Sequence, residues 1–573
     1  MKKLLPLLLL PLTLQVANAQ QTVKKVTTPS TSIAKSYVSK VWVADNGDGT
    51  YNNPIIHADY SDPDAIRVGD DYYLVASSFN YVPGLPILHS KDLVNWSIVA
   101  NVFTQQPPYS RYDSVQHGGG GWAPAIRFHK GEFYIYYPDP DLGIYVVKAK
   151  NITGPWSIPL LIKNSKGWID PCPFWDEDGK AYLVNGMAGS RAGIKSCLIL
   201  SRMSDDGTQL LDDGALVFDG HGKHPTIEGP KMYKRNGYYY ILAPAGGVGT
   251  GWQVAMRSKD IYGPYEDKIV LEKGTAVTNG PHQGALLETQ TGENWFIHFQ
   301  DKDAYGRIAH LEPVKWVNDW PLMGVDKDGN GIGEPVLTYK KPNVGQTYPI
   351  NTPQESDEFN DSKLGLQWQW DANPKSNFCF PAGKSYGFLR LYNVPVPENT
   401  TNFWNVPNLL TQKFPAPDFS ATTKFTFTPR TDDEETGLII SGIDYAYISV
   451  KKIANGLVVS QTKCINAENG ATEKKSNEVA VKSETLYFKV NVRNILPNTN
   501  DYKTYNIAEN SPYGNALCTF SYSEDGKSFT TIAEPFAAKK GKWVGATVGI
   551  FAIRHGKTYE TGYADYDWFR VDK

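Results

Sequence analysis

An internal repeat of about fifty residues constrains the fold of this chain more than any other feature. In the first half of the sequence, a turn containing glycine is followed five times by an aromatic strand, and the first aromatic residues of successive strands lie 49 to 61 residues apart. The five segments are Gly69–Tyr73, Gly131–Tyr134, Gly179–Tyr182, Asn236–Tyr239 and Gly292–Trp295. Units of this period, with about four strands each, are typical of propeller blades. The repeat therefore predicts a five-bladed β-propeller over roughly residues 50 to 310.

The repeat also aligns polar residues that lie far apart in the chain. The segment Ala65–Arg67 recurs as Ala125–Arg127, which sets the register of the units. Carried through all units, this register assigns five residues to one structural position: Asp62, Trp122, Asp170, Glu228 and His282. The first strand of each blade lines the central channel, so equivalent positions meet around the propeller axis. An isolated carboxylate usually lies in a turn or on the surface, but three at one repeat position predict a functional site, because buried charges are costly.

The first nineteen residues have the pattern of a secretion signal. Lys2 and Lys3 precede an apolar run of about eleven residues, and Ala17–Ala19 is a small-residue cleavage site. The run is too short to span a bilayer, and no other segment is apolar enough to be transmembrane. We therefore expect a periplasmic or secreted protein that begins at Gln20 after processing and is not inserted in a membrane.

Charge and cysteine content exclude several classes of protein. The formal net charge is -3, and the chain has no long basic run, which argues against a nucleic-acid partner. The five cysteines form an odd, sparse set that does not resemble a disulfide framework, and their spacing fits no zinc motif. Aromatic residues make up 13% of the chain, which suits both strands and the binding of sugar rings.

The second half of the chain predicts a separate β-domain. Residues 339–355 are rich in Pro, Asn and Gln, as in a linker. Beyond it, apolar and polar residues form strand-like segments such as Thr423–Phe427 and Val548–Ile553, with no helical stretch. The sequence therefore predicts an all-β chain with four parts: a signal peptide (1–19), a propeller (20–338), a linker (339–355) and a β-sandwich (356–573).

The motifs around the aligned positions resemble those of family 43 glycoside hydrolases, the arabinofuranosidase and β-xylosidase group. The matching blocks in the propeller are Tyr60–Leu74, Pro83–Ile87, His89–Leu93, Trp122–Pro124, Ile169–Pro171, Ile227–Pro230, Gly306–Arg307 and His310–Val314. In the second half, Asp357–Phe359 and Tyr566–Phe569 resemble the concanavalin-A-like (jelly-roll) sandwich that follows the catalytic domain in part of this family. Two small departures are the segment Ala58–Tyr60, which precedes the first carboxylate, and Cys172.

The resemblance implies a role for each carboxylate. Asp62 would be the general base that activates water, and Glu228 the general acid that protonates the departing oxygen. Asp170 would position Glu228 and raise its pKa. Elementary chemistry asks for such a set, because glycoside cleavage needs one protonated and one ionised carboxyl group across the scissile bond. A third carboxylate nearby favours the protonated form of the acid by like-charge repulsion.

The resemblance also implies residues that bind the sugar. Trp122 and Phe79 would form apolar walls of the pocket, and Arg307 would donate hydrogen bonds to sugar hydroxyls, unless it is an ordinary strand-edge arginine. For His282 two readings stay open: it lies under the substrate and ligates a structural Ca²⁺ or another ion on the propeller axis, or it is a hydrogen-bonded structural histidine. The chemistry itself requires no cofactor.

The expected activity is that of an exo-acting, inverting glycosidase. The first choice is release of terminal non-reducing α-L-arabinofuranose from hemicellulose side chains, such as those of arabinoxylan or xyloglucan oligosaccharides. The alternative is a β-D-xylosidase acting on xylo-oligosaccharides, and a more distant one is a non-catalytic carbohydrate-binding protein. The partner in each case is an oligosaccharide or polysaccharide. The sandwich would either help to close the pocket or act as an independent carbohydrate-binding module, and the sequence does not indicate the oligomeric state.

Overall fold

The computed structural model describes residues 36–275, 280–495, 515–556 and 558–573, all within a single structural unit. The expected signal peptide, residues 1–19, lies outside the described residues. Within the described ranges, the helices are too short and too polar to cross a membrane.

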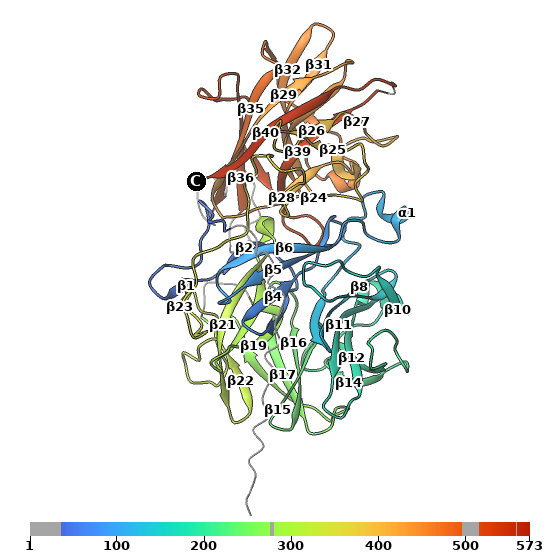
Figure 1. The fold of residues 1–573 in the computed structure, drawn as a ribbon, viewed down its shortest axis with the longest axis vertical. Coiled ribbons are helices and arrows are strands. Elements are labelled where there is room, and N and C mark those ends of the chain that lie inside the picture. Colours follow the sequence, from blue (N-terminus) through green and yellow to red (C-terminus); the bar gives the residue numbers. More distant parts are fainter. Residues whose placement is uncertain (1–35, 276–279, 496–514, 557) are drawn as a thin grey trace, which may run out of the picture. The chain divides into compact units, whose positions relative to one another are not determined.

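Five antiparallel sheets follow one another in the first part of the chain, one for each repeat unit (Figure 1). The first two consist of β3 (Asp64–Val68), β4 (Asp71–Val75), β5 (Gly84–Ser90) and β6 (Trp96–Phe103), and of β7 (Ala125–His129), β8 (Glu132–Asp139), β9 (Gly143–Ala149) and β10 (Leu160–Asn164). The next two consist of β11 (Trp168–Trp175), β12 (Ala181–Met187), β13 (Cys197–Met203) and β14 (Ala215–Asp219), and of β15 (Lys231–Arg235), β16 (Tyr238–Ala245), β17 (Trp252–Ser258) and β18 (Glu266–Leu271). The predicted five-bladed propeller is confirmed.

The fifth blade joins two distant parts of the chain. It contains β19 (His282–Glu288), β20 (Asn294–Asp301) and β21 (Arg307–Val317), with β22 (Trp320–Met323) paired to β21. Its remaining strand is β2 (Ile56–Asp59), which precedes the first blade in sequence and pairs antiparallel with β21. Because β2 leads directly into blade one, this pairing fixes the start of the propeller to its end.

The second part of the chain is a sandwich of two β-sheets, as predicted. One sheet contains β24 (Gln369–Trp370), β28 (Leu410–Lys413), β39 (Thr547–Arg554), β30 (Glu434–Ser441), β31 (Tyr445–Ile453), β32 (Gly456–Cys464) and β33 (Lys474–Lys475), with β27 (Val394–Pro395) and β34 (Val479–Val481). The other contains β25 (Cys379–Pro381), β26 (Leu389–Tyr392), β40 (Tyr563–Asp572), β29 (Phe419–Thr428), β35 (Thr485–Ile495), β36 (Asn515–Ser523), β37 (Thr530–Thr531) and β38 (Phe536–Ala538). Burial alternates along β29, so Phe425 and Phe427 face the core between the sheets.

The propeller and the sandwich are joined by main-chain hydrogen bonds and by packing. Val82 and Trp370 exchange backbone hydrogen bonds of 2.7 and 3.0 Å across the boundary. The ring of Tyr305, from the propeller, lies in the apolar core of the sandwich, 5.9 Å from the ring centroid of Phe414. The two domains therefore share part of one core.

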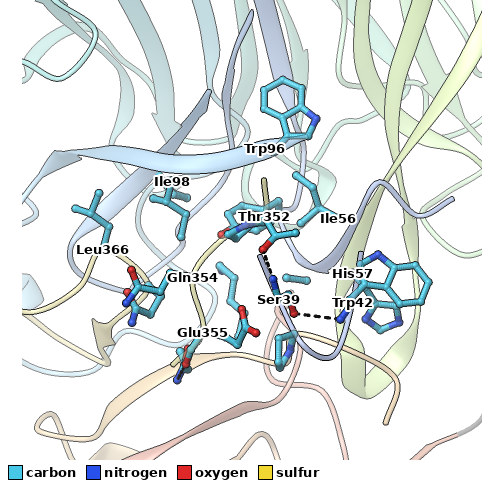
Figure 2. A pocket seen from close by; sticks show the side chains of 18 of the residues that line it. Ser39, Trp42, Ile56, His57, Trp96, Ile98, Thr352, Gln354, Glu355 and Leu366 are labelled. Carbon is cyan, nitrogen blue, oxygen red and sulfur yellow. Dashed lines mark hydrogen bonds between the residues drawn. The ribbon is translucent and has the colours of Figure 1, made fainter. Parts of the chain in front are cut away.

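A cavity of about 70 Å³ lies along this boundary, between blade one, the segment 351–355 and the sandwich (Figure 2). At its edge the backbone N–H of Ser39 donates to Thr352 Oγ1 at 2.8 Å, and the N–H of Trp42 donates to Ser39 Oγ at 3.1 Å. Burial raises the pKa of Glu355, which lines the cavity, to about 7. None of the three candidate catalytic carboxylates lines this cavity, so it is separate from the site described next.

Candidate active site

The repeat-equivalent residues share local backbone features at the inner strands. Asp62 lies two residues before β3 and Glu228 three residues before β15, whereas Asp170 and His282 lie within β11 and at the start of β19. Strand pairing shifts register between Ile169 and Cys172, at Asp170, and again between His282 and Gly284. Asp62 and Asp170 also share a left-handed backbone, with φ of 53° and 56°. Such φ values are unfavourable for residues other than glycine and cluster at functional sites.

Asp62 is held in a network of donors. Its Oδ2 accepts hydrogen bonds of 2.7 Å from the hydroxyls of Ser61 and Ser77. Arg307 Nη1 lies 3.2 Å from Asp62 Oδ1 and 2.8 Å from Ser61 Oγ. Arg307 starts β21 of blade five, and the structure places it beside Asp62, with hydrogen bonds to the carboxylate and to Ser61. These donors stabilise the negative charge of Asp62.

Asp170 is tied to the residue that follows Glu228. Its Oδ2 accepts a hydrogen bond of 2.7 Å from the backbone N–H of Gly229. Burial raises the pKa of Asp170 well above its usual range, the negative charges of Glu228 and Asp62 raise it further, and the charge of Lys231 acts against them. The three carboxylates are thus close enough to influence one another, and Asp170 fixes the backbone beside Glu228.

Glu228 is the most open of the three carboxylates, with 29% of its side chain exposed. On one side, a Cβ built on Gly186 would lie 3.6 Å from both Glu228 Cβ and Asp170 Oδ2, so this glycine of β12 stands beside both groups. On the other side, His282 Nε2 lies 3.2 Å from Glu228 Oε1, without the alignment of a hydrogen bond. An exposed carboxyl flanked by a buried one is suited to reach a substrate.

The ion site expected at His282 stays a prediction. Ca²⁺ takes about six to eight oxygen ligands. In the part of the chain that the structure describes, no group of three or more histidine, cysteine or acidic side chains is placed to hold a metal ion. His282 is buried against the ring of Phe299, at 5.1 Å between centroids, and beside Glu228.

Aromatic rings form one wall of the site. Trp122 packs edge-on against Phe79, at 6.0 Å between ring centroids, and its Nε1–H donates to the carbonyl of Gly118 at 3.0 Å. Phe79 is only 2% exposed, so it supports Trp122 from behind and offers little surface of its own. The guanidinium of Arg191, on the short helix α2 (Gly189–Ala192), lies 5.6 Å from the Trp122 ring centroid.

A residue of the sandwich completes this wall, and the sequence did not predict it. Trp543, between β38 and β39, lies 6.1 Å from the Trp122 ring centroid, and the Arg307 guanidinium lies 5.6 Å from the Trp543 centroid. Of these side chains, Trp543 and Arg307 line a cavity of about 440 Å³, together with Arg191. The signal in the sequence was a tryptophan in the glycine- and lysine-rich segment 539–545, but nothing local indicated which surface it would reach. The sandwich therefore takes part in the pocket.

The arrangement defines a class of enzyme. The site combines a partly exposed carboxyl, a buried carboxyl that favours its protonated form and a carboxylate that accepts hydrogen bonds from two hydroxyls and from Arg307; Arg307 also lines the cavity beside Trp543. Acid–base cleavage of a glycosidic bond requires such a set of carboxyl groups, and the protein is a glycoside hydrolase. Residues 51–321 match the model of glycosyl hydrolases family 43, and residues 356–572 match that of the β-xylosidase C-terminal concanavalin-A-like domain. The chain belongs to glycoside hydrolase family 43.

Several relatives resemble this chain over most of their length. A protein of Xylanibacter ruminicola named putative β-xylosidase is 39% identical over 89% of this chain and 88% of its own. A β-xylosidase of Formosa agariphila is 35% identical over 96% and 94%. The non-reducing end α-L-arabinofuranosidase BoGH43B of Bacteroides ovatus is 29% identical over 91% and 94%. A solved structure described as Bacteroides ovatus xyloglucan PUL GH43B superposes with a TM-score of 0.75, at 25% identity, over 91% of this chain and 99% of that one.

Proposed function

We propose that the protein is an exo-acting, inverting β-D-xylosidase that removes terminal xylose from xylo-oligosaccharides. The observation that carries this proposal is the three-carboxylate site in a chain that is 39% and 35% identical, over most of its length, to proteins named putative β-xylosidase and β-xylosidase. The sequence alone placed arabinofuranosidase activity first. The site chemistry serves both pentoses equally and does not decide between them. The names of the two relatives place xylosidase activity first.

The proposed mechanism assigns one step to each carboxylate. Asp62, as general base, takes a proton from a water molecule, whose oxygen attacks the anomeric carbon. Glu228, as general acid, gives its proton to the glycosidic oxygen as the bond from that oxygen to the anomeric carbon breaks. Asp62 precedes blade one and Glu228 precedes blade four, so they approach the sugar from non-adjacent blades. This placement favours single-step inversion, which needs space for a water between the base and the sugar.

Asp170 and Arg307 act through these two groups in the proposal. Asp170 accepts a hydrogen bond from the Gly229 N–H and thereby positions the neighbouring Glu228. Arg307 orients Asp62 and presents its remaining N–H groups to the sugar. The tryptophan wall would carry the apolar face of one pentose ring. Trp543 lines the same cavity as Arg307, and in this proposal it limits the pocket to a chain end.

A second candidate is α-L-arabinofuranosidase activity. The relative BoGH43B is named for this activity, acting at non-reducing ends, and it is 29% identical over 91% of this chain. The same acid, base and aromatic wall would serve arabinofuranose, with a different fit of the ring hydroxyls. Xyloglucan or arabinoxylan side chains would then be the source of the sugar.

Hydrolysis of the two p-nitrophenyl pentosides by purified protein tests the ranking. We expect kcat/KM on the β-D-xyloside to exceed that on the α-L-arabinofuranoside, and the Asp62→Asn protein serves as the inactive control. A clear excess of arabinofuranosidase activity would make the second candidate the function. Oligosaccharide binding without any product would instead support a non-catalytic binding protein.

We also propose that the protein is exported after cleavage between Ala19 and Gln20. The support is the charged start, the short apolar run and the small residues at the cleavage site. Mass spectrometry of the protein isolated from its native host should find Gln20 at the mature N-terminus. Recovery of the uncut chain in the cytoplasmic fraction would contradict this.

A further inference from the structure

A buried carboxylate three residues before Asp62 holds two distant backbone segments at once. Asp59, at the end of β2, is 5% exposed and belongs to the segment that departs from the family pattern. Its Oδ1 accepts a hydrogen bond of 2.8 Å from the backbone N–H of Arg307, and its Oδ2 accepts one of 2.9 Å from the N–H of Gly545. Arg307 belongs to the propeller, and Gly545 to the sandwich. One side chain therefore joins the two domains directly behind the pocket.

The junction leaves no space for other side chains. A Cβ built on Gly306 would lie 2.5 Å from Asp59 Cγ, and one built on Gly545 would lie 2.7 Å from the Gly306 nitrogen. Contacts below 3.0 Å are not found for real Cβ atoms. The next residue of the sandwich loop, Ala546, donates its N–H to the carbonyl of Ala304 at 2.7 Å. The chain segments around Asp59, Gly306 and Gly545 thus meet with backbone against backbone. This close approach requires glycine at positions 306 and 545.

Each hydrogen bond of Asp59 holds one part of the pocket. The Arg307 N–H belongs to the residue whose guanidinium binds Asp62 and lies beside Trp543. The Gly545 N–H lies two residues after Trp543 itself. Burial raises the pKa of Asp59, whereas Lys413, the two N–H donors and Arg307 act against that rise and favour the carboxylate, which can accept both hydrogen bonds.

We infer that Asp59 is a positioning residue that couples the sandwich loop 539–545 to Arg307 and so holds Trp543 and the arginine in register beside the sugar pocket. Its consequence for catalysis rests on the proposed function, whereas the coupling of loop and arginine does not. Asparagine at this position would present an acceptor to one N–H but an NH₂ donor to the other. Asp59→Asn should therefore release one of the two segments while keeping the size of the side chain.

Limited proteolysis tests the coupling without any substrate. The loop contains Lys539, Lys540 and Lys542, so trypsin reports directly on its release. We expect Asp59→Asn to be cut in the loop about ten-fold faster than the wild type or more, as judged by mass spectrometry of C-terminal fragments, because cleavage follows the population of the open loop. Equal rates would overturn the inference.

Two further variants keep this test decisive. Asp92→Asn is the matched control, because Asp92 is also buried and accepts N–H bonds from Val94 and Asn95, but on the outer turn of blade one. It should leave the loop as resistant as in the wild type, and faster loop cleavage in this variant would overturn the inference. If Asp59→Asn does not fold, Gly545→Ala opens the same junction with Asp59 intact, and it should also expose the loop. A resistant loop in Gly545→Ala would contradict the coupling.

Kinetics test the consequence for the pocket. Asp59→Asn should lower kcat/KM about ten- to hundred-fold, mostly through KM, by the same factor for good and poor leaving groups, because no proton transfer is affected. In a Trp543→Ala background the same substitution should lower kcat/KM by a clearly smaller factor, since the two act through one unit. Full additivity would overturn the inference. If neither pentoside is hydrolysed, the proposed function fails, but the trypsin experiment still decides whether Asp59 holds the loop.

Discussion

The propeller and the sandwich are both largely antiparallel and both bury polar groups, but the candidate catalytic groups all lie in the propeller. The propeller buries Asp62, Asp170, Lys231 and His282 at or beside its inner strands. The sandwich core is apolar, with residues such as Phe425 and Phe488 packed between its sheets. The blades of a propeller meet at an axis where equivalent positions converge. The two sheets of a sandwich instead pack face to face, and the space between them is filled by side chains. The propeller therefore carries the chemistry, and the sandwich contributes through the loop with Trp543.

The strongest way to break this comparison is to remove the base from the propeller axis. Asp62→Asn should lower kcat by about 10³-fold on both xylobiose and a dinitrophenyl xyloside, because water activation is lost whatever the leaving group. Circular dichroism and xylose binding, which do not need the base, serve as controls for the fold. A loss of less than about ten-fold on either substrate would mean that the base lies elsewhere.

Removal of the acid should produce a different pattern. Glu228→Gln should lower kcat on xylobiose by about 10³-fold, but by only about ten-fold on the dinitrophenyl substrate, whose leaving group needs little protonation. Proton NMR of the wild-type reaction should show the anomeric configuration inverted before mutarotation. If Glu228→Gln and Asp62→Asn respond alike to leaving-group acidity, or if the product retains configuration, the roles given to the two carboxylates are wrong.

A smaller effect is expected from the contribution of the sandwich. Trp543→Ala should lower kcat/KM on the nitrophenyl xyloside by about ten- to thirty-fold, as expected for the loss of one aromatic contact with a sugar. Trp568→Ala is the matched control: Trp568 lies on β40 beside Tyr487 and Arg570, so activity should stay within about two-fold. Equal losses in the two variants would show that the sandwich acts only through stability.

The smallest effect concerns pH and the boundary between the domains. Burial raises the pKa of Glu355 from 4.5 to about 7, so the folded protein binds this proton more tightly than the unfolded chain. Stability from this group is present below about pH 4.5 and is lost as the pH rises towards 7. Glu355→Gln should therefore raise the free energy of unfolding at pH 8 by on the order of 1 kcal/mol and have little effect at pH 4.5. Urea unfolding at both pH values measures this, and a stabilisation confined to low pH would contradict it.

Much of the site could be predicted because it follows from a repeat. The spacing of the blades placed Asp62, Asp170, Glu228, Trp122 and His282 at equivalent positions, and the structure puts all of them at or beside the inner strands. The strand that completes the fifth blade could not be predicted from the sequence. It is β2, which pairs with β21 about 250 residues later in the chain, and no local pattern indicates that partner.

The sequence by itself determined the blade repeat, the five aligned positions and the division into propeller and sandwich, because each depends on periodicity along the chain. Only the tertiary structure decided which donors hold Asp62, that Asp59 binds both Arg307 and Gly545, and that Trp543 faces Trp122. These contacts join residues hundreds of positions apart, and they depend on how blade five closes the propeller and on how the sandwich docks on it. Their geometry is set by the packing of whole domains, and such packing leaves no periodic trace in the residues that it brings together.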